Sequence, residues 1–202
     1  MFVHSLRAAA AASSVGAIVL VVPPGDVVVA KGTIEELAGD APVAAVVDGG
    51  TSRQESARLG IAAAPPSRLI IVHDAARPFA PPSLFDRVAK AVTEPFAGAI
   101  PVIESADTVK RVREGRVVET LPRAELGLVQ TPQAFGAAAL RAAHDAAARE
   151  GWAVTDDAML LERAGLEVAV VAGDRLNFKI TTEADLRRAE TLLASGEAGR
   201  LP

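Results

Sequence analysis

The sequence predicts an α/β protein with a mainly parallel sheet, and three observations support this prediction. Short aliphatic runs alternate with segments of helical periodicity along most of the chain, which is typical of β-α-β units. The run Leu69-Ile70-Ile71-Val72 has no polar alternation, as expected of a strand buried on both faces. Half of the residues are hydrophobic but only 3% are aromatic, so the core must be aliphatic, which suits helices layered on a sheet.

Length and composition exclude several classes of protein. A chain of 202 residues suits one domain, here taken as residues 1–202. The net charge of −4 provides no basic field for nucleic acid, and the absence of Cys excludes disulfides and thiolate sites. No apolar run approaches the roughly 20 residues that span a bilayer. We therefore expect a soluble, cytoplasmic protein with no membrane or nucleic-acid partner.

The first half of the chain alternates helices and strands. A helix is expected where Phe2, Val3 and Leu6 share one face, and a strand that follows it ends at a double proline, since proline cannot donate to a sheet. A second aliphatic strand runs into a Gly-Gly turn, and the Leu69 strand runs into His73 and Asp74. The expected elements are helix 1–12, strand 17–22, helix 31–38, strand 43–47, helix 53–63 and strand 69–72.

The second half contains a hairpin inserted between the core elements. Ser83 and Asp86 resemble a capping box that opens helix 83–92, and strand 97–103 follows. Residues 108–112 and 117–121 flank a Glu114-Gly115 turn and have mixed polarity, so both faces of the hairpin should be solvated. Because an isolated hairpin is only marginally stable, we expect this β-arm, at about 106–124, to pack on something else, for which a second subunit is one candidate.

The last third returns to the core. Residues 127–133 lead to an Ala-rich helix 134–150, on which His144 is expected at the surface. Thr155-Asp156-Asp157 is interpreted as a helix start, with capping favoured as the role of both acids. Strand 167–171 precedes the last helix, for which Thr182 forms a capping box with the acid three residues later. Residues 195–202 are expected to be frayed.

Polar side chains gather where the predicted strands end. In open α/β sheets, ligands bind at this edge, although a strand-end ion pair or an ordinary Gly-Gly turn would explain each feature alone. The chain has no phosphate loop, dinucleotide fingerprint or nucleophile elbow. Mixed cations, hydroxyls and few carboxylates instead suit phosphorylated substrates with a divalent metal, as in phosphoryl or nucleotidyl transfer. The candidates are Asp48, Arg53, Ser56, Asp74, Arg77, Thr108, Lys110, Arg123, Thr131, Asn177 and Lys179.

Five motifs in order resemble the 2-C-methyl-D-erythritol 4-phosphate cytidylyltransferase family, over residues 1 to about 193. They are Asp48-Gly49-Gly50, His73-Asp74-Ala75-Ala76-Arg77-Pro78, Gln130-Thr131-Pro132-Gln133, Thr155-Asp156-Asp157-Ala158 and Asn177-Phe178-Lys179-Ile180-Thr181. The resemblance implies a Rossmann-like nucleotidyltransferase fold whose β-arm joins two subunits into a homodimer. It also implies transfer of CMP from CTP to methylerythritol phosphate, with Mg²⁺ and release of pyrophosphate, in isoprenoid precursor synthesis.

The resemblance implies a role for each matching site residue. Gly50 and Ser56 would lie against the cytidine, and Asp74 would meet nucleotide and metal. Arg123, supplied across the dimer, and Lys179 would position the attacking phosphate and act with Asp74 as catalytic groups. The residues expected around methylerythritol phosphate are Arg77, Thr108, Arg123, Thr131 and Thr155.

One departure separates the chain from the family pattern. Family members begin with a strand and a Gly-rich loop carrying an Arg and a Pro-Lys pair, whereas Met1 to Leu6 resembles the helix that follows that loop. We therefore expect an open sheet with exposed apolar edges, and either a start placed too late or an inactive copy. Two alternative functions remain: a cytidylyltransferase for a pentitol phosphate such as ribitol 5-phosphate, and a non-catalytic dimerising remnant.

Overall fold

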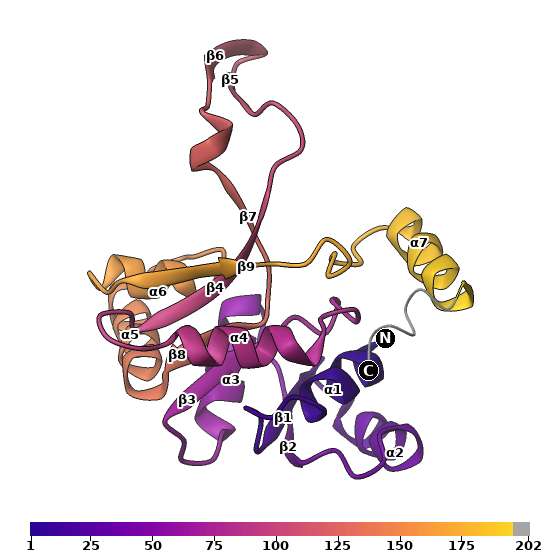
Figure 1. The fold of residues 1–202 in the computed structure, drawn as a ribbon. Coiled ribbons are helices and arrows are strands. Elements are labelled where there is room, and N and C mark those ends of the chain that lie inside the picture. The colour runs from indigo at the N-terminus through magenta and orange to yellow at the C-terminus, as the bar shows by residue number, and fades with distance from the viewer. Residues whose placement is uncertain (196–202) are drawn as a thin grey trace.

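The computed structural model describes residues 1–195 and confirms the predicted alternation of helices and strands. Figure 1 shows helices packed around a central sheet, with a narrow arm extending away from it. The elements of the first half are α1 (Phe2–Ala10), β1 (Ile18–Val22), α2 (Val27–Leu37), β2 (Val43–Asp48), α3 (Arg53–Ala63) and β3 (Leu69–Val72). The frayed end expected at residues 195–202 lies, beyond Ser195, outside the described residues.

The second half supplies most of the central sheet. Its elements are α4 (Pro82–Ala91), β4 (Gly98–Glu104), β5 (Lys110–Arg113), β6 (Arg116–Thr120), the 3₁₀ helix η1 (Arg123–Glu125), β7 (Gly127–Val129), β8 (Gln133–Gly136), α5 (Ala137–Glu150), α6 (Ala158–Arg163), β9 (Val168–Ala172) and α7 (Glu183–Ala194). Strands β3 and β4 both run antiparallel to β8, and β9 runs parallel to β4. Hence β3, β4 and β9 share one direction, and their carboxyl ends meet at one edge.

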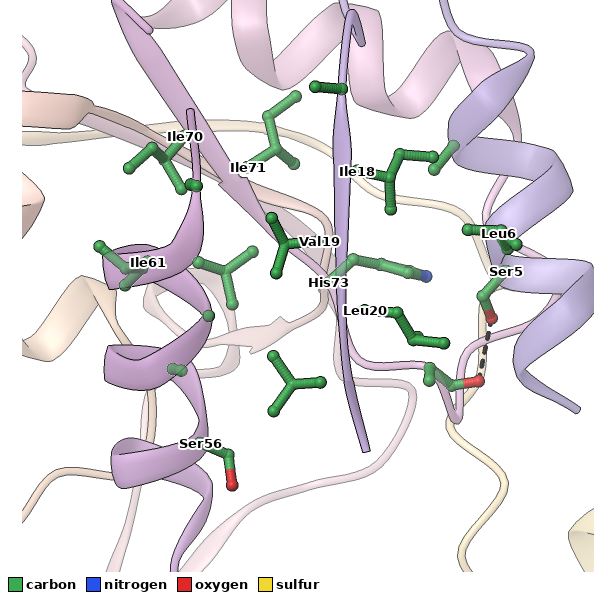
Figure 2. Close-up of a pocket in the computed structure, with 18 of the residues that line it drawn as sticks. Ser5, Leu6, Ile18, Val19, Leu20, Ser56, Ile61, Ile70, Ile71 and His73 are labelled. Atoms are coloured by element: carbon green, nitrogen blue, oxygen red, sulfur yellow. Dashed lines mark hydrogen bonds between the residues drawn. The ribbon is translucent and has the colours of Figure 1, made fainter. Parts of the chain in front are cut away.

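The sheet is open between β1 and β3. Strand β1 pairs in parallel with β2 alone, and β3 pairs with β8 alone. A cavity of about 790 Å³ separates the two strands and is lined mainly by aliphatic side chains, among them Val19, Ile61 and Ile70. Figure 2 shows this space with α1 beside it, where the Ser5 hydroxyl donates a hydrogen bond to the Ala75 carbonyl oxygen. The described strands therefore leave two unpaired edges facing an apolar cavity, in agreement with the open sheet expected from the sequence.

The main core lies between the central sheet and helices α5 and α6. Phe135, Leu140, Leu160 and Leu161 are fully buried there. Burying each such side chain contributes roughly 1.5–3 kcal/mol. This packing fixes α5 and α6 against β4 and β8, and it thereby fixes the start of α6, which lies at the site described below.

The predicted β-arm is present as the β5–β6 hairpin. All residues of both strands are exposed, so both faces are solvated, as expected. Glu114 and Gly115 have φ angles of 49° and 74°, the pair of positive values that a two-residue type I′ turn requires. Val112, Val117 and Val118 are exposed on this arm, which extends away from the body of the protein (Figure 1).

The structure corrects three predicted helix starts. The Ala-rich helix begins at Ala137 rather than Ala134, because residues 133–136 pair with β3 and β4 as strand β8. Helix α4 begins at Pro82, so Ser83 is not its cap, and Asp86 accepts a hydrogen bond from the Ser14 backbone N–H instead. Helix α2 begins at Val27, four residues earlier than expected.

The capping box of the last helix is confirmed. The Thr182 hydroxyl accepts a hydrogen bond from the Asp185 backbone N–H, and the Asp185 carboxylate accepts one in return from the Thr182 backbone N–H. Within residues 1–195, no helix is both long and apolar enough to cross a membrane.

Candidate active site

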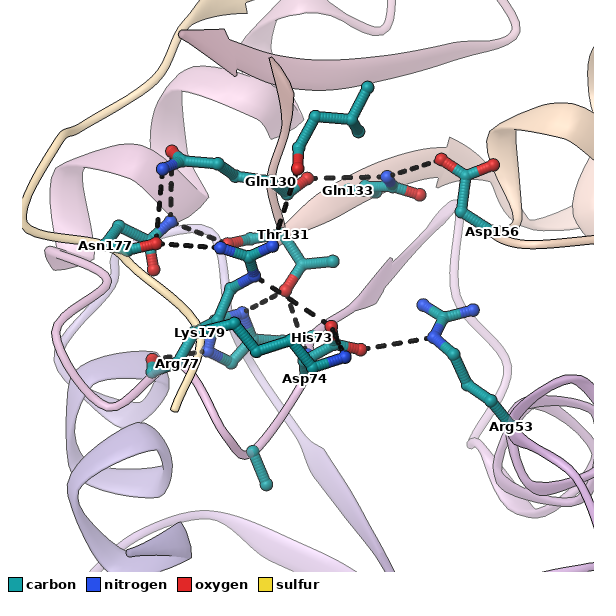
Figure 3. Close-up of polar contacts among 12 residues, drawn as sticks. Arg53, His73, Asp74, Arg77, Gln130, Thr131, Gln133, Asp156, Asn177 and Lys179 are labelled. Atoms are coloured by element: carbon teal, nitrogen blue, oxygen red, sulfur yellow. Dashed lines mark hydrogen bonds and ion pairs between the residues drawn. The ribbon is translucent and has the colours of Figure 1, made fainter. Parts of the chain in front are cut away.

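The candidate site is a single carboxylate, Asp74, held among three cations at the carboxyl end of β3 (Figure 3). Its Oδ1 atom accepts a hydrogen bond from Arg53 Nε at 3.2 Å, and its Oδ2 atom pairs with Lys179 Nζ at 3.0 Å. Arg77 Nε lies 3.9 Å from the same Oδ2. The cations come from the start of α3, the turn after β3 and the loop before α7. Strand ends therefore bring these charges together, as the sequence predicts.

The electrostatics of the site favour an anionic ligand. Burial opposes ionisation of Asp74, but the hydrogen bond from Lys179 and the charges of Arg53 and Lys179 outweigh it and hold the Asp74 pKa below its usual range. Arg53 also contacts the carboxylate of Asp157. Three cations thus face two carboxylates, an excess of one positive charge, which attracts a negatively charged ligand such as a phosphate.

The backbone at Asp74 is fixed by a buried histidine and a threonine. His73 Nε2 donates a hydrogen bond to the Arg77 carbonyl oxygen at 3.1 Å, which leaves Nδ1 to accept one from the Thr131 hydroxyl at 3.1 Å. The Thr131 oxygen in turn accepts the Asp74 backbone N–H at 3.0 Å. Burial lowers the His73 pKa to about 4, so the neutral ring required by this arrangement is the stable form at neutral pH. Thr131, expected to contact substrate, therefore also holds Asp74 in place.

A buried amide network anchors the loop that carries Lys179. Asn177 Nδ2 donates to the Thr131 carbonyl oxygen at 2.8 Å, and Gln130 Nε2 donates to the Asp174 carbonyl oxygen at 2.7 Å. Arg77 Nη1 donates to the Asn177 carbonyl oxygen at 2.9 Å. The side chain of Lys179 is 40% exposed, so it keeps access to solvent and ligand while its backbone is held. Sequence reasoning placed Asn177 at the site but did not identify this anchoring role.

The Gly-Gly turn lies beside the same site. The Ser56 hydroxyl accepts a hydrogen bond from the Gly50 backbone N–H at 3.1 Å and donates one to the Ser52 carbonyl oxygen at 2.9 Å. Neither Gly49 nor Gly50 has a positive φ. A Cβ atom on Gly49 would lie 2.8 Å from Ser56 Oγ and 3.1 Å from the Val22 carbonyl oxygen, so the close approach of the backbone favours glycine at this position. Both glycines and Ser56 line the polar end of the cavity, next to Arg53 and Asp74.

Several predicted site residues are not joined to this cluster in the described part of the chain. Thr108 and Arg123 are exposed at the base of the arm, where Arg123 Nη1 donates a hydrogen bond to the Ala106 carbonyl oxygen at 3.3 Å. The arm itself extends away from the sheet (Figure 1). Thr155 is exposed in the loop before α6, two residues from Asp157. The roles expected of these three residues stay predictions.

Two functional candidates were missed, because the sequence suggested simpler roles for them. His144 was expected at the surface but is buried, since it faces Asp157 and not solvent. Asp157 precedes α6 but makes no side-chain hydrogen bond to that helix, whereas Asp156 accepts the Met159 backbone N–H at 3.1 Å. The capping interpretation is therefore confirmed for Asp156 and wrong for Asp157. The sequence contained one signal of this difference: Asp156 and Asp157 are adjacent at the helix start, and a helix needs only one of them as a cap.

The residues present can hold a magnesium ion only together with ligand oxygens. Within residues 1–195, no cluster of three or more His, Asp or Glu side chains could hold a metal ion by itself. Mg²⁺ is commonly held by one or two carboxylates, with its other ligands taken from substrate phosphates and water. Asp74, the carboxylate at the centre of the cluster, fits that coordination for a metal that enters with a phosphorylated ligand.

The fold and the site together are those of a nucleotidyltransferase. Phosphoryl-group transfer relies on positioned cations and on neutralising charge more than on a covalent nucleophile, and cations around one carboxylate at a strand edge match this requirement. A Rossmann-like nucleotidyltransferase fold accounts for both the sheet and the position of the site.

Comparison with known proteins identifies the family. The family model described as 2-C-methyl-D-erythritol 4-phosphate cytidylyltransferase matches residues 1–195, and the chain belongs to this family. The protein of that name from Pelotomaculum thermopropionicum is 42% identical over 200 residues, which cover 98% of this chain and 83% of that protein. The crystal structure of 4-diphosphocytidyl-2C-methyl-D-erythritol synthase from Anaerococcus prevotii aligns with a TM-score of 0.87 and 31% identity, covering 96% of this chain and 85% of that one.

Some relatives are about twice as long as this chain. The bifunctional enzyme IspD/IspF from Nitratidesulfovibrio vulgaris is 45% identical over 186 residues, which are 90% of this chain but 47% of that protein. The chain therefore spans about half the length of such bifunctional relatives.

Proposed function

We propose that this chain is a cytidylyltransferase that transfers CMP from CTP to 2-C-methyl-D-erythritol 4-phosphate and releases pyrophosphate, a step of isoprenoid precursor synthesis. The observation that carries the proposal is the Asp74 carboxylate held between Arg53, Arg77 and Lys179 at a strand edge. Relatives that carry this activity in their names are about 40% identical over nearly the whole chain.

In the proposed reaction, a phosphate oxygen of the acceptor attacks the α-phosphorus of CTP. A new P–O bond forms, the bond between the α-phosphorus and its bridging oxygen breaks, and the electron pair leaves with pyrophosphate. Lys179 lies against Asp74 and is partly exposed, so it would bind the two reacting phosphates and bring them together. Arg77, held by the Asn177 carbonyl oxygen, would face the acceptor.

Mg²⁺, held by Asp74 together with phosphate oxygens, would neutralise charge on the triphosphate when bound. Gly50 and Ser56 would lie against the cytidine, and Thr131 and Thr155 would lie near the acceptor. Removing one such electrostatic contact typically lowers the rate by about 10²–10³.

We further propose that the active form is a cytoplasmic homodimer joined through the β5–β6 arm, with Thr108 and Arg123 completing the partner's site. The exposed valines of the arm support this proposal, since an isolated two-stranded hairpin buries too little apolar surface to be stable alone. Analytical ultracentrifugation should give twice the chain mass, and Val117→Lys should shift it to the monomer. A monomeric wild-type protein would contradict this part of the proposal.

The direct test of function is an assay of pyrophosphate release by the purified protein with CTP, Mg²⁺ and methylerythritol phosphate. We expect release that depends on all three, and a product with the mass of the cytidine diphosphate derivative. Ribitol 5-phosphate is assayed in parallel, and a higher kcat/KM with it would favour the alternative acceptor. A folded protein that releases no pyrophosphate with either acceptor would refute the proposal. Calorimetry with Mg·CTP would then show whether the chain binds nucleotide.

A further inference from the structure

A buried ion pair lies behind the Asp74 site, on the side away from Lys179. The side chain of Asp157 is 1% exposed, and both of its oxygens are used. Oδ1 accepts a hydrogen bond from His144 Nε2 at 2.9 Å, and Oδ2 accepts one from Arg53 Nη1 at 2.9 Å. A carboxylate buried this deeply is tolerated only when its oxygens are paired, so Asp157 is fixed in one position.

Arg53 joins this buried carboxylate to the candidate site. While Nη1 is held by Asp157, Nε donates to Asp74 Oδ1 at 3.2 Å. A guanidinium is a rigid planar fork, so a hydrogen bond at one nitrogen also sets the direction of the others. The side chain of Arg53 is 35% exposed, and among the described residues its guanidinium contacts Asp74 and Asp157. Without Asp157, the guanidinium would be free to turn toward solvent or to bind Asp74 through two nitrogens.

A purely local role for Asp157 does not fit the contacts. It stands at the N-terminus of α6, but its side chain makes no hydrogen bond to the backbone of that helix, and the side chain of the neighbouring Asp156 caps the helix instead. Its partners lie on α5 and α3, which are distant in sequence. The Asp157–Arg53 pair also lowers the net positive charge of the site. Asp157 neutralises Arg53, which would otherwise bind Asp74 more tightly and compete with Lys179.

We propose that Asp157, held from behind by His144, is a positioning residue that orients Arg53 and thereby sets the Asp74 carboxylate for Lys179 and the ligand. The proposal rests on the proposed nucleotidyl transfer for its kinetic consequences. Its structural content, the placement of Arg53 by Asp157, does not depend on that activity.

The kinetic test compares Asp157→Asn, Arg53→Lys and the double variant with the wild type. Misplacing a positioned group typically lowers the rate by up to about 10², so Asp157→Asn should lower kcat by about 10–100-fold and change KM for CTP much less. Lys keeps the charge of Arg53 but lacks the fork. Adding Asp157→Asn to Arg53→Lys should therefore produce no further loss, because Asp157 acts through Arg53.

Asp145→Asn is the matched control, since Asp145 is next to His144 in sequence but exposed, and it should leave kcat unchanged. If Asp157→Asn does not fold, His144→Ala tests the same link between Asp157 and Arg53. His144→Ala should lower kcat, by less than the loss expected for Asp157→Asn. In the Arg53→Lys background, His144→Ala should not lower kcat further. Wild-type kcat in a folded Asp157→Asn or His144→Ala protein, or losses that add in the double variant, would overturn the proposal.

A spectroscopic readout separates this proposal from the proposed function. The Arg53 Nε–H NMR signal should shift in Asp157→Asn and stay in place in Asp145→Asn, whether or not the protein turns over. An unchanged Arg53 signal would refute the positioning role. A shifted signal in a protein that releases no pyrophosphate would instead refute the proposed function alone.

Discussion

Asn177→Ala is expected to destabilise the protein through the buried network that anchors the Lys179 loop. Asn177 is fully buried, and its Nδ2 donates to the Thr131 carbonyl oxygen at 2.8 Å and to Gln130 Oε1 at 3.4 Å. The alanine leaves the Thr131 oxygen without this donor, and an orphaned buried acceptor costs about 1–3 kcal/mol. The contact at 3.4 Å is long and adds little.

Two further features place the loss in the lower part of that range. Asn177 Oδ1 is buried without a hydrogen-bond partner among the described residues, so the alanine also removes one unsatisfied acceptor. The backbone contacts of residue 177 to Asp174 and Arg77 do not involve the side chain and should persist. We therefore expect a loss of about 1–2 kcal/mol in the free energy of unfolding.

Urea denaturation of the wild type, Asn177→Ala and Asn177→Asp measures this directly. The aspartate is the same size but places a carboxylate oxygen opposite the Thr131 carbonyl oxygen if Oδ1 keeps its place, so it should destabilise more than the alanine. Equal stability of all three proteins would refute the reasoning, because it would mean that the amide donor to Thr131 does not hold the loop.

Three other predictions concern the turn after β3, the helix α7 and the open edges of β1 and β3. The His73 pKa is about 4 in the folded protein, against 6.5 in the unfolded chain, so the unfolded state binds a proton first as the pH falls. The free energy of unfolding should therefore decrease between about pH 6.5 and pH 4. An NMR titration that places the His73 pKa near 6.5 would contradict this. Thr182→Ala should cost about 1 kcal/mol of stability through the lost cap. Thermal unfolding measures this beside Thr191→Ala, an exposed threonine within the same helix, and equal losses in both would count against the capping box. Alternate amides of β1 and β3, on the edges that face the cavity, should exchange faster than those of β4, which is paired on both sides, and uniform protection would show that the edges are paired in solution.

Local patterns predicted much of this fold. The aliphatic runs gave the strands β1, β2, β3 and β9 to within one or two residues, and the Glu114-Gly115 turn located the arm. Thr182 and Asp185 predicted their capping box correctly because such a box involves only residues three apart.

Strand β8 could not be predicted from its own residues. Gln133-Ala134-Phe135-Gly136 is short, and Ala-rich sequence follows it directly, so helical propensity favoured an earlier helix start. The segment is a strand because it fills the space between β3 and β4, and such long-range pairing overrides local propensity.

The candidate site was predicted in part. Strand-end reasoning brought Arg53, Asp74, Arg77 and Lys179 to one edge, where the structure places them. It did not find the pairing of His144 with Asp157, because the partners are set by the packing of α5 against α6 and not by spacing along the chain. Thr108 and Arg123 are exposed and not joined to this cluster in the described residues, and their roles belong to the proposed dimer.

The central claim is that the cations around Asp74 position phosphates for transfer, and the kinetics of Lys179→Met test it most directly. Methionine keeps the length of the side chain but removes the charge, whereas Lys31→Met makes the same change at an exposed position on α2. Lys179→Met should lower kcat/KM for pyrophosphate release by about 10²–10³, while Lys31→Met should match the wild type. Equal kcat/KM in the wild type and Lys179→Met would show that the charge of Lys179 does not position the phosphates.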